Sequence, residues 1–207
     1  ILPEERYDEM IRVFEKNGAF VINKPEDKEA IRAAMFEEGA MSRHAVGQSV
    51  QTIAKLAGLT VPEGTKVIIV EADGSGEKDI LAKEKMCPVL AAFRYKTFEE
   101  GVEIARDNLE EEGKGHSVSI HSNNKEHIEY AGQELCVSRF VVNQTCATSA
   151  GGSFFNGLAP TNTLGCGSWG NNSISENLDY KHLINISRIA YYMKDNHVPT
   201  DEELWKL

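Results

Sequence analysis

The stretch Val67-Ile68-Ile69-Val70 is an unbroken run of β-branched apolar residues. Such a run is typical of a strand that is buried on both faces of a parallel sheet. Working outward from it, other short apolar runs predict strands, and apolar residues at helical spacing predict helices between them. Strands are expected at residues 19–22, 89–93, 117–122 and 139–143, and helices at 7–14, 25–35, 50–57, 97–109 and 124–134. The alternation predicts an α/β domain with a mostly parallel sheet and flanking helices.

Several boundaries of these helices carry their own signals. Asn17-Gly18 ends the first helix, Pro25 suits the first position of the second, and Gly58 closes the third. Thr97 and Glu100 have the spacing of a capping box, in which the hydroxyl and the carboxylate each accept a hydrogen bond from a free backbone amide. Residues 41–46 lose the helical pattern and are expected to form a loop.

The composition limits the classes of function. The 207 residues suit one domain, or one lobe with an appendage, and 41% hydrophobic with 26% charged residues is ordinary for a soluble globular protein. A net charge of −10 without a basic stripe argues against a nucleic-acid partner. No apolar run has the length of a membrane span and no signal peptide opens the chain, so no membrane partner is expected. Because the chain begins at Ile1 with an immediate helix entry, we expect this end to be a cut.

The four cysteines, Cys87, Cys136, Cys146 and Cys166, are widely spaced and include no Cys-x-x-Cys pair. We interpret them as reduced thiols of a cytoplasmic protein. A zinc site built from them and the six histidines lacks the usual ligand spacing, so no metal is expected.

A second informative stretch is Thr163-Leu-Gly-Cys-Gly-Ser-Trp-Gly-Asn-Asn-Ser-Ile-Ser-Glu-Asn177. Three glycines and a series of small polar residues within fifteen positions indicate that backbone approaches backbone, or a ligand, very closely there. The spacing Gly165-x-Gly167-x-x-Gly170 also matches a dinucleotide-binding pattern. No strand–helix unit follows it, so we reject a Rossmann interpretation at this position.

The chain changes character after Thr145, where Gly, Ser, Thr and Asn become frequent and helical periodicity disappears. Residues 182–191 are again rich in apolar side chains and are suited to a strand. Their place near the end of the sequence makes them a candidate arm that is exchanged between subunits.

Four blocks of the sequence together resemble one enzyme family. They are Val46-Gly47-Gln48 with the following Ile53 to Gly58 segment, the segment around Glu84, Gly115-His116-Ser117, and residues 163–177. In order and spacing they are similar to the CoA-acylating aldehyde dehydrogenases, both the succinate-semialdehyde type and the aldehyde half of bifunctional aldehyde–alcohol dehydrogenases. The resemblance covers nearly the whole chain.

The resemblance implies a domain organisation. Residues 1–180 would be the C-terminal, thioester-forming catalytic lobe, with an α/β fold related to the Rossmann type. Residues 181–207 would be an oligomerisation arm and tail, so a homodimer or larger homo-oligomer is expected. Most of the dinucleotide domain and the catalytic cysteine would lie upstream of Ile1, so residues 1–207 alone are expected to be inactive.

Glu84 lies in the segment Lys83-Glu-Lys-Met-Cys-Pro-Val89. Taken alone, most glutamates of this kind simply face solvent. The segment resembles the Glu-x-Phe-Gly-Pro-Val stretch of aldehyde dehydrogenases, although Met86 and Cys87 replace the commoner residues. The resemblance implies that Glu84 grips the nicotinamide ribose, and a carboxylate does have two acceptor oxygens for two adjacent hydroxyls.

His116 lies between two glycines and the strand expected at 117–122. A lone histidine in such a place is more often structural than catalytic. The CoA-acylating family carries a histidine in the same Gly-His-(Ser/Thr) context, which implies that His116 is the base or positioning group for the CoA thiol. The chemistry agrees, because a thiol with a pKa near ~8.5 is mostly protonated at neutral pH, and an imidazole with a pKa near ~6.5 can take its proton.

Two further residues receive non-catalytic interpretations. Cys166 is expected to be a small side chain buried where backbone segments touch, since free cysteines are often buried. The resemblance implies that Asn143 shapes the path into a substrate tunnel.

The implied reaction interconverts an aldehyde and its acyl-CoA with NAD or NADP and coenzyme A, through a cysteine thioester. Succinate semialdehyde is the favoured aldehyde, because the chain stops at Leu207 without an alcohol dehydrogenase domain. The alternatives are the acetylating part of a bifunctional aldehyde–alcohol dehydrogenase, and a non-catalytic oligomerisation module. In the last case Glu84 and His116 would tolerate substitution.

Overall fold

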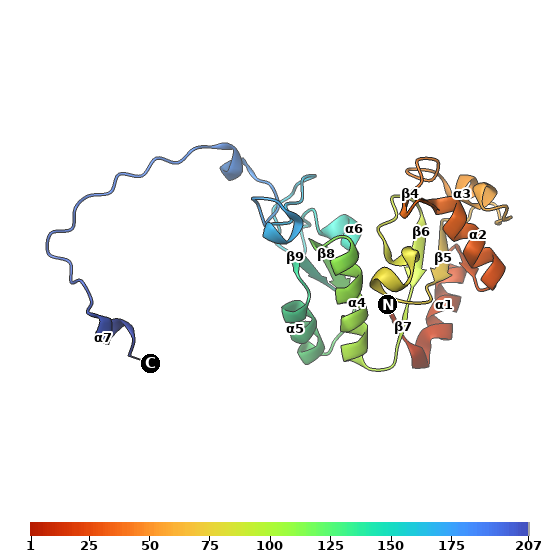
Figure 1. The fold of residues 1–207 in the computed structure, drawn as a ribbon, viewed down its shortest axis with the longest axis horizontal. Helices are drawn as coiled ribbons and strands as arrows, with labels where there is room; N and C mark the ends of the chain where they lie inside the picture. The colour runs from red at the N-terminus through yellow and green to blue at the C-terminus, as the bar shows by residue number, and fades with distance from the viewer. Residues whose placement is uncertain (207) are drawn as a thin grey trace.

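The computed structural model describes residues 1–206, which form two parallel β-sheets with helices packed on them and an extended C-terminal segment (Figure 1). The first sheet has the order β2-β5-β6, with strands Ala19–Ile22, Val67–Glu71 and Val89–Ala92. The second pairs β8 (Gly115–Ile120) with β9 (Val137–Val142). The predicted α/β class with mostly parallel pairing is confirmed, although the described strands form four sheets rather than one, and these two contain the longer strands.

The central position of strand β5 explains why its sequence is almost entirely apolar. Ile68 and Val70 face a core shared with α2 (Pro25–Met35) and α3 (Val50–Leu56), whereas Ile69 faces a smaller core with α1 (Tyr7–Lys16). All three side chains are at most 3% exposed. Because alternate residues of a strand point to opposite faces, a strand covered on both sides must be apolar at every position.

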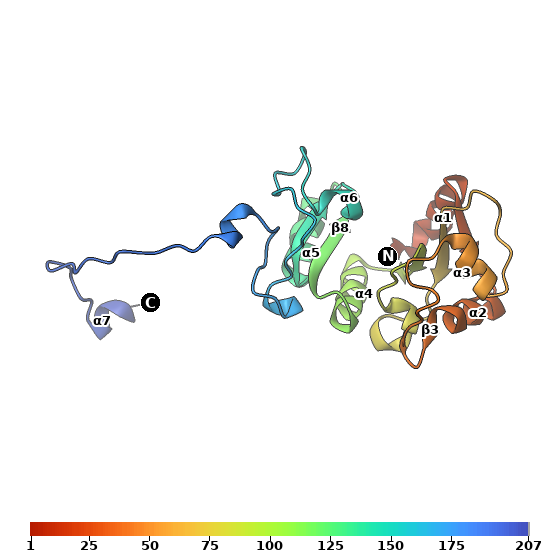
Figure 2. The same ribbon diagram turned by 90° about the horizontal axis from the view of Figure 1, so that it is seen from above.

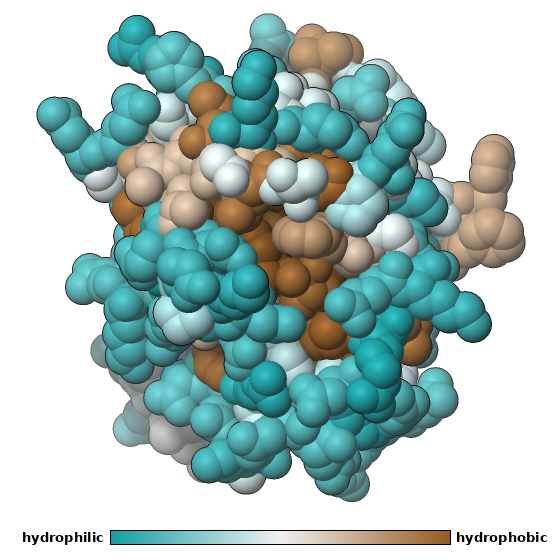
Figure 3. Space-filling model, turned by 90° about the vertical axis from the view of Figure 1, so that its right-hand side faces the viewer, coloured by the Kyte–Doolittle hydropathy of each residue, from teal (hydrophilic) through white to brown (hydrophobic). Residues whose placement is uncertain are grey.

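The helices α1, α2 and α3 lie on one side of the molecule, and α1 and α2 carry charged residues on their solvent faces. This side is mostly hydrophilic, with a band of apolar surface through its middle and further apolar groups toward its edges (Figure 3). Pro25 occupies the start of α2 as expected, and the hydroxyl of Ser49 accepts a hydrogen bond from the amide of Thr52 to cap α3. Caps of this type satisfy amides that have no partner inside the helix.

The second sheet is covered by α4 (Phe98–Glu111) and α5 (Lys125–Glu134), whose apolar faces meet β8 and β9. The capping box predicted for α4 is only half correct. The Thr97 hydroxyl accepts from the amide of Glu100, but the Glu100 carboxylate accepts from the amide of Lys96 instead of Thr97. The carboxylate therefore reaches one residue further back than the usual box.

Several short contacts connect the part built on the first sheet with the part built on the second. The strands β1 (Leu2–Pro3) and β7 (Arg94–Tyr95) pair in parallel, and the Ser75 hydroxyl donates to the Asp107 carboxylate of α4 at 2.7 Å. The remaining elements are short: β3 (Phe36–Glu37), β4 (Ala40–Met41), α6 (Cys146–Ser149), α7 (Asp201–Leu204) and the 3-10 turns Glu4–Arg6, Gly76–Lys78, Ile80–Ala82, Ser168–Gly170 and Tyr180–Leu183.

The strand predicted at residues 182–191 is wrong for the described chain. Tyr180–Leu183 is a 3-10 turn, and residues 184–200 contain neither helix nor strand. This segment leaves the body as an extended strap (Figures 1 and 2), so no strand of the same chain lies beside it to supply hydrogen bonds. A sequence suited to a strand forms one only where a neighbouring strand pairs with it.

Candidate active site

A cleft of about 580 Å³ opens between the two sheets and collects both site residues that the sequence singles out. Glu84 reaches it from the loop before β6, and His116 from the beginning of β8. Cys146 of α6 and Ile1 also line it, together with apolar side chains such as Leu109. None of the described lining residues is a lysine or an arginine.

Contacts across the cleft hold the Glu84 loop in place. The amide of Glu84 donates to the carboxylate of Glu112 at 2.7 Å, and Lys83 pairs with Glu111 at 3.2 Å. Lys85 turns inward and donates to the carbonyl oxygens of Leu81 and Lys83, and burial lowers the pKa of its ammonium group. The Glu84 carboxylate itself receives no hydrogen bond from the described residues, so both of its oxygens are free to accept one from a ligand.

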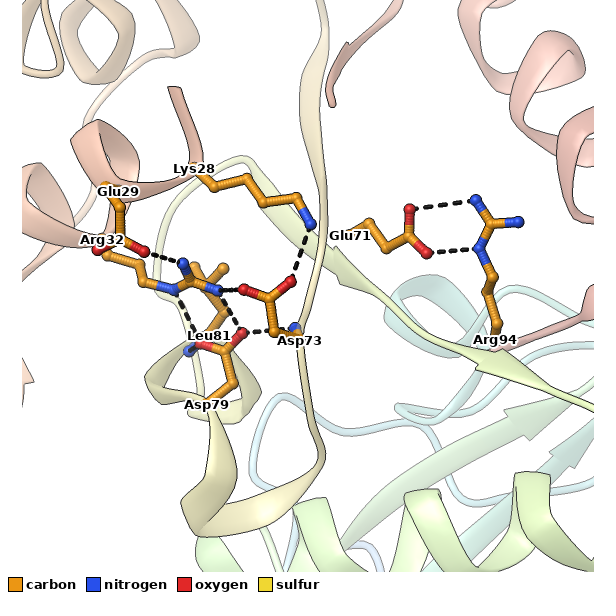
Figure 4. Close-up of polar contacts among 8 residues, drawn as sticks. All are labelled: Lys28, Glu29, Arg32, Glu71, Asp73, Asp79, Leu81 and Arg94. Carbon is orange, nitrogen blue, oxygen red and sulfur yellow. Dashed lines mark hydrogen bonds and ion pairs between the residues drawn. The ribbon is translucent and has the colours of Figure 1, made fainter. Parts of the chain in front are cut away.

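The turn that leads into this loop is anchored by one arginine (Figure 4). Arg32 of α2 donates through two nitrogens to the Asp79 carboxylate, at 3.0 and 2.6 Å, and also to Asp73 at 2.6 Å. Asp79 in turn accepts from the amides of Asp73 and Leu81, which starts the 3-10 turn Ile80–Ala82. Helix α2 thus determines where the chain enters the cleft.

The pKa of Asp79 shows which effect dominates at this buried site. Burial alone raises the pKa of a carboxyl group, but hydrogen bonds from Arg32 and from two backbone amides outweigh it and hold the pKa below its usual range. A carboxylate with a depressed pKa in the folded state stabilises the fold above its ordinary pKa. That stabilisation is lost as the pH falls through the folded-state value.

Replacing Asp79 by asparagine is therefore expected to lower the free energy of unfolding near neutral pH by about 3 kcal/mol, since Arg32 loses its buried counter-charge. The difference from wild type should begin to shrink below about pH 4, where Asp79 of the unfolded wild type becomes protonated, and should disappear as the pH falls through the depressed folded-state pKa. Denaturant unfolding at pH 7 and pH 3.5 measures both values. The exposed pair Arg6–Glu9 offers the control, since Glu9→Gln should change little. An Asp79→Asn effect independent of pH would contradict this account.

Polar contacts with Ser117 and Arg139 hold His116 in place. Its Nδ1 lies 3.0 Å from the hydroxyl of Ser117, and its backbone carbonyl accepts from Arg139 at 2.8 Å. The side chain is exposed on the cleft side, so the ring can meet a ligand. His116 and Glu84 thus line the same cleft.

The glycine-rich turn at residues 163–177 packs directly against the His116 segment. A Cβ on Gly115 would lie far inside van der Waals distance of the Cys166 carbonyl oxygen, and one on Gly165 would meet the Ile174 carbonyl in the same way. Gly115 also has a φ of +85°, which side-chain-bearing residues rarely adopt. The close approach of backbone to backbone predicted from this composition is therefore present. The Ser168–Gly170 turn is not a strand–helix unit, which agrees with rejecting a Rossmann site.

The remaining candidates lie outside the cleft lining. Cys166 is half-buried in the glycine-rich turn, in keeping with a packing role. Asn143 adopts a left-handed conformation with a φ of 53°, and its side-chain amide bonds both the amide and the carbonyl of Ser122. It joins the ends of β8 and β9, and no contact with the cleft is present among the described residues.

Two residues near the site were not predicted to be part of it. Cys146 lines the cleft, but burial raises the pKa of its thiol even though Arg139 lies near, so at neutral pH it stays protonated and weakly nucleophilic. Arg139 is buried behind His116. The signal that could have revealed it is a single arginine inside the apolar run of β9, where a charged side chain requires an explanation.

Among residues 1–206 there is no group of three or more His, Cys, Asp or Glu side chains that could hold a metal ion. Within the same range no helix has the length and apolar character needed to cross a membrane.

No protein-family model matches the chain, but single proteins do. The succinate-semialdehyde dehydrogenase (acetylating) of Clostridium kluyveri is 58% identical over 99% of this chain and 45% of its own length. The bifunctional aldehyde-alcohol dehydrogenase of Escherichia coli K12 is 37% identical over 92% of this chain and 22% of its own length. The crystal structure of an acetylating aldehyde dehydrogenase from Geobacillus thermoglucosidasius superimposes with a TM-score of 0.86 at 31% identity, over 97% of this chain and 44% of that one.

The chain spans less than half of the length of these relatives. Over that span, however, the agreement extends through nearly all of its residues in both sequence and structure. In sequence and in fold the chain belongs to the CoA-acylating aldehyde dehydrogenases, and it corresponds to a part of them.

Proposed function

We propose that these residues form the thioester-cleaving part of an oxidoreductase that interconverts an aldehyde and its acyl-CoA. The observation that carries the proposal is the single cleft that brings together His116, the free carboxylate of Glu84 and the first residue of the chain. A non-catalytic module would have no need for an exposed imidazole and an unpaired carboxylate in the lining of one cleft.

His116 acts on the CoA thiol in this proposal. The S–H bond of the thiol breaks as the imidazole takes the proton, and the thiolate adds to the carbonyl carbon of the acyl thioester. The enzyme's cysteine leaves as a thiolate, and the acyl group departs as acyl-CoA.

Glu84 fits the nicotinamide cofactor, NAD or NADP, because its free carboxylate can accept from the two hydroxyls of a ribose. The cofactor supplies the hydride acceptor of the aldehyde oxidation. The backbone bond from Glu84 to Glu112 and the inward turn of Lys85 hold the loop, so the carboxylate is pre-positioned.

Replacing Glu84 by glutamine is expected to raise the KM for NAD(P) by about tenfold, since each charge-assisted hydrogen bond becomes a neutral one. The KM for CoA should stay unchanged, which separates cofactor binding from damage to the whole cleft. Steady-state kinetics with one substrate varied at a time gives both constants. Equal losses for the two substrates would contradict the assignment.

The nucleophile is proposed to lie in the part of the relatives that this chain does not span, because Cys146, the cysteine of the cleft lining, keeps a raised pKa. Residues 1–207 alone should therefore not catalyse the reaction.

The four cysteines are unpaired in the structure, which supports a cytoplasmic protein.

Succinate semialdehyde is the proposed aldehyde, on the strength of the 58% identity to the Clostridium kluyveri enzyme of that name. The described cleft lining holds no lysine or arginine for a succinyl carboxylate. The group that binds this carboxylate is accordingly proposed to come from the preceding half of the polypeptide.

The proposal is tested with the polypeptide extended upstream of Ile1 to the length of its relatives. Oxidation of NADH and of NADPH would be followed with succinyl-CoA, acetyl-CoA and butyryl-CoA. Succinyl-CoA should be reduced fastest, whereas preference for acetyl-CoA would favour the acetylating type found in bifunctional enzymes. Absence of reaction with every acyl-CoA would sink the proposal.

The strap at residues 184–200 is proposed to be an assembly arm. It exposes Ile184, Ile186, Ile189, Tyr191 and Tyr192, each more than half accessible to solvent. Apolar side chains in such number on an extended segment indicate that another chain covers them. Deleting residues 184–207 is expected to reduce the oligomer to a smaller species in light scattering, and an unchanged mass would contradict this role.

A further inference from the structure

Arg139 is a buried cation directly behind the candidate base. It is 2% exposed, and its three hydrogen-bond acceptors in the described chain are all uncharged oxygens. Burying a guanidinium without a counter-charge costs free energy, so a role in packing alone does not account for this residue. A residue of this kind calls for a geometric explanation.

Each donor of Arg139 fixes a different part of the site. Nε donates to the Ser117 hydroxyl at 2.9 Å, one terminal nitrogen to the His116 carbonyl at 2.8 Å, and the other to the Gly165 carbonyl at 2.6 Å. Arg139 lies directly opposite Ser117 in the parallel pairing of β8 and β9, so the register places it there. The planar fork of an arginine can serve three directions at once, which a lysine ammonium on a flexible stem cannot reproduce.

The Ser117 hydroxyl connects this fork to the ring of His116. Its oxygen has two acceptor lone pairs, and Arg139 Nε, which can only donate, occupies one of them. The other can accept from a protonated Nδ1 of His116, which lies 3.0 Å away. In that arrangement the ring carries its proton on Nδ1 and Nε2 has none, whereas a Ser117 hydroxyl that donated to Nδ1 would give the opposite tautomer.

We propose that Arg139, acting through Ser117, is the positioning residue that orients His116 with Nε2 as the proton-accepting nitrogen, an inference that rests on the function proposed above. When the thiol S–H bond breaks, its proton passes to Nε2, and the bond from Nδ1–H to the Ser117 oxygen persists in the imidazolium. The same residue ties the glycine-rich turn to the His116 segment through the Gly165 carbonyl.

The kinetic test uses the polypeptide extended upstream of Ile1, loaded with its acyl group and then mixed with CoA in a single turnover. Ser117→Ala and Arg139→Lys are expected to slow CoA-dependent cleavage of the acyl-enzyme by about tenfold. This is less than the full rate contribution of a general base, because the imidazole remains and only its orientation is lost. Formation of NAD(P)H in the preceding acylation should be unchanged. Ser117→Thr keeps the hydroxyl and should restore most of the rate.

The matched control is Ser138→Ala, which removes a buried hydroxyl that has no hydrogen-bond partner among the described residues. It should cleave the acyl-enzyme at the wild-type rate. If Ser117→Ala and Arg139→Lys also match wild type while His116→Ala is slow, the positioning role is overturned and the proposed function stands. If wild type itself shows no CoA-dependent cleavage, the proposed function fails instead.

A second readout needs no substrate. Nitrogen NMR of ¹⁵N-histidine-labelled protein reports which ring nitrogen of His116 is protonated. In the wild-type neutral ring it should be Nδ1, and in Ser117→Ala the proton should shift toward Nε2. Identical His116 signals in the two proteins would overturn the inference, even if the variant were slower because of a change in folding.

Discussion

Replacing His116 by alanine is expected to slow CoA-dependent cleavage of the acyl-enzyme by about 10²–10⁴-fold, the usual contribution of a positioned general base. The imidazole lies in the cleft next to Ser117 and opposite the Glu84 loop, where a thiol can reach it. The preceding formation of NAD(P)H should continue at the wild-type rate, because it does not use this base. Rapid mixing of the extended polypeptide with aldehyde first and CoA afterwards separates the two steps.

The pKa of the attacking thiol provides an internal control for that experiment. A thiol with a pKa well below neutrality is already ionised and has no proton for His116 to remove. The deficit of His116→Ala should therefore shrink as the thiol becomes more acidic. A deficit that stays the same for every thiol would mean that His116 only shapes the binding site.

Replacing Gly115 by alanine is expected to lower the free energy of unfolding by about 2–5 kcal/mol. Two effects add: the φ of +85° strains any residue with a side chain, and the new Cβ would overlap the carbonyl oxygen of Cys166. The nearest atoms, which belong to Cys166 and Gly170, are backbone atoms and cannot move aside like the end of a flexible side chain. Because His116 follows directly, CoA-dependent activity should fall with stability, and denaturant unfolding with a parallel activity assay measures both.

Gly64 offers a matched control, since its φ of +83° is almost the same but nothing lies within 4 Å of the position of a Cβ. Gly64→Ala should cost only about 1–2 kcal/mol, the price of the backbone conformation alone. The difference between the two variants isolates the contact with the glycine-rich turn. Equal losses in stability would show that the contact contributes nothing.

The elements that the sequence predicted correctly are those whose signal is local. The β-branched run 67–70 is buried on both sides as β5, Pro25 begins α2, and the glycines of 163–177 lie where backbone meets backbone. The pairing of Glu84 with His116 in one cleft could be anticipated only through the resemblance, because they are 32 positions apart in sequence, from 84 to 116. Spacing alone does not say that two loops converge.

The features that were missed depend on partners far away in the sequence. Glu100 is a local exception, since its carboxylate accepts from the amide of Lys96, four positions away, rather than from that of Thr97. The segment 182–191 has the composition of a strand, but within the described chain it finds no neighbour. The roles of Arg139 and Arg32 depend on acceptors that the fold brings to them, so even the unusual place of Arg139 in an apolar run could not identify those acceptors.

The most direct test of the central claim is the identity of the product. The polypeptide extended upstream of Ile1 would be incubated with succinate semialdehyde and NAD(P), with and without CoA, and the products separated by chromatography and mass spectrometry. The account predicts repeated turnover only with CoA and succinyl-CoA as the product, with at most one NAD(P)H per site without CoA. Sustained formation of free succinate without CoA would contradict it, because water rather than a thiol activated by His116 would then cleave the thioester.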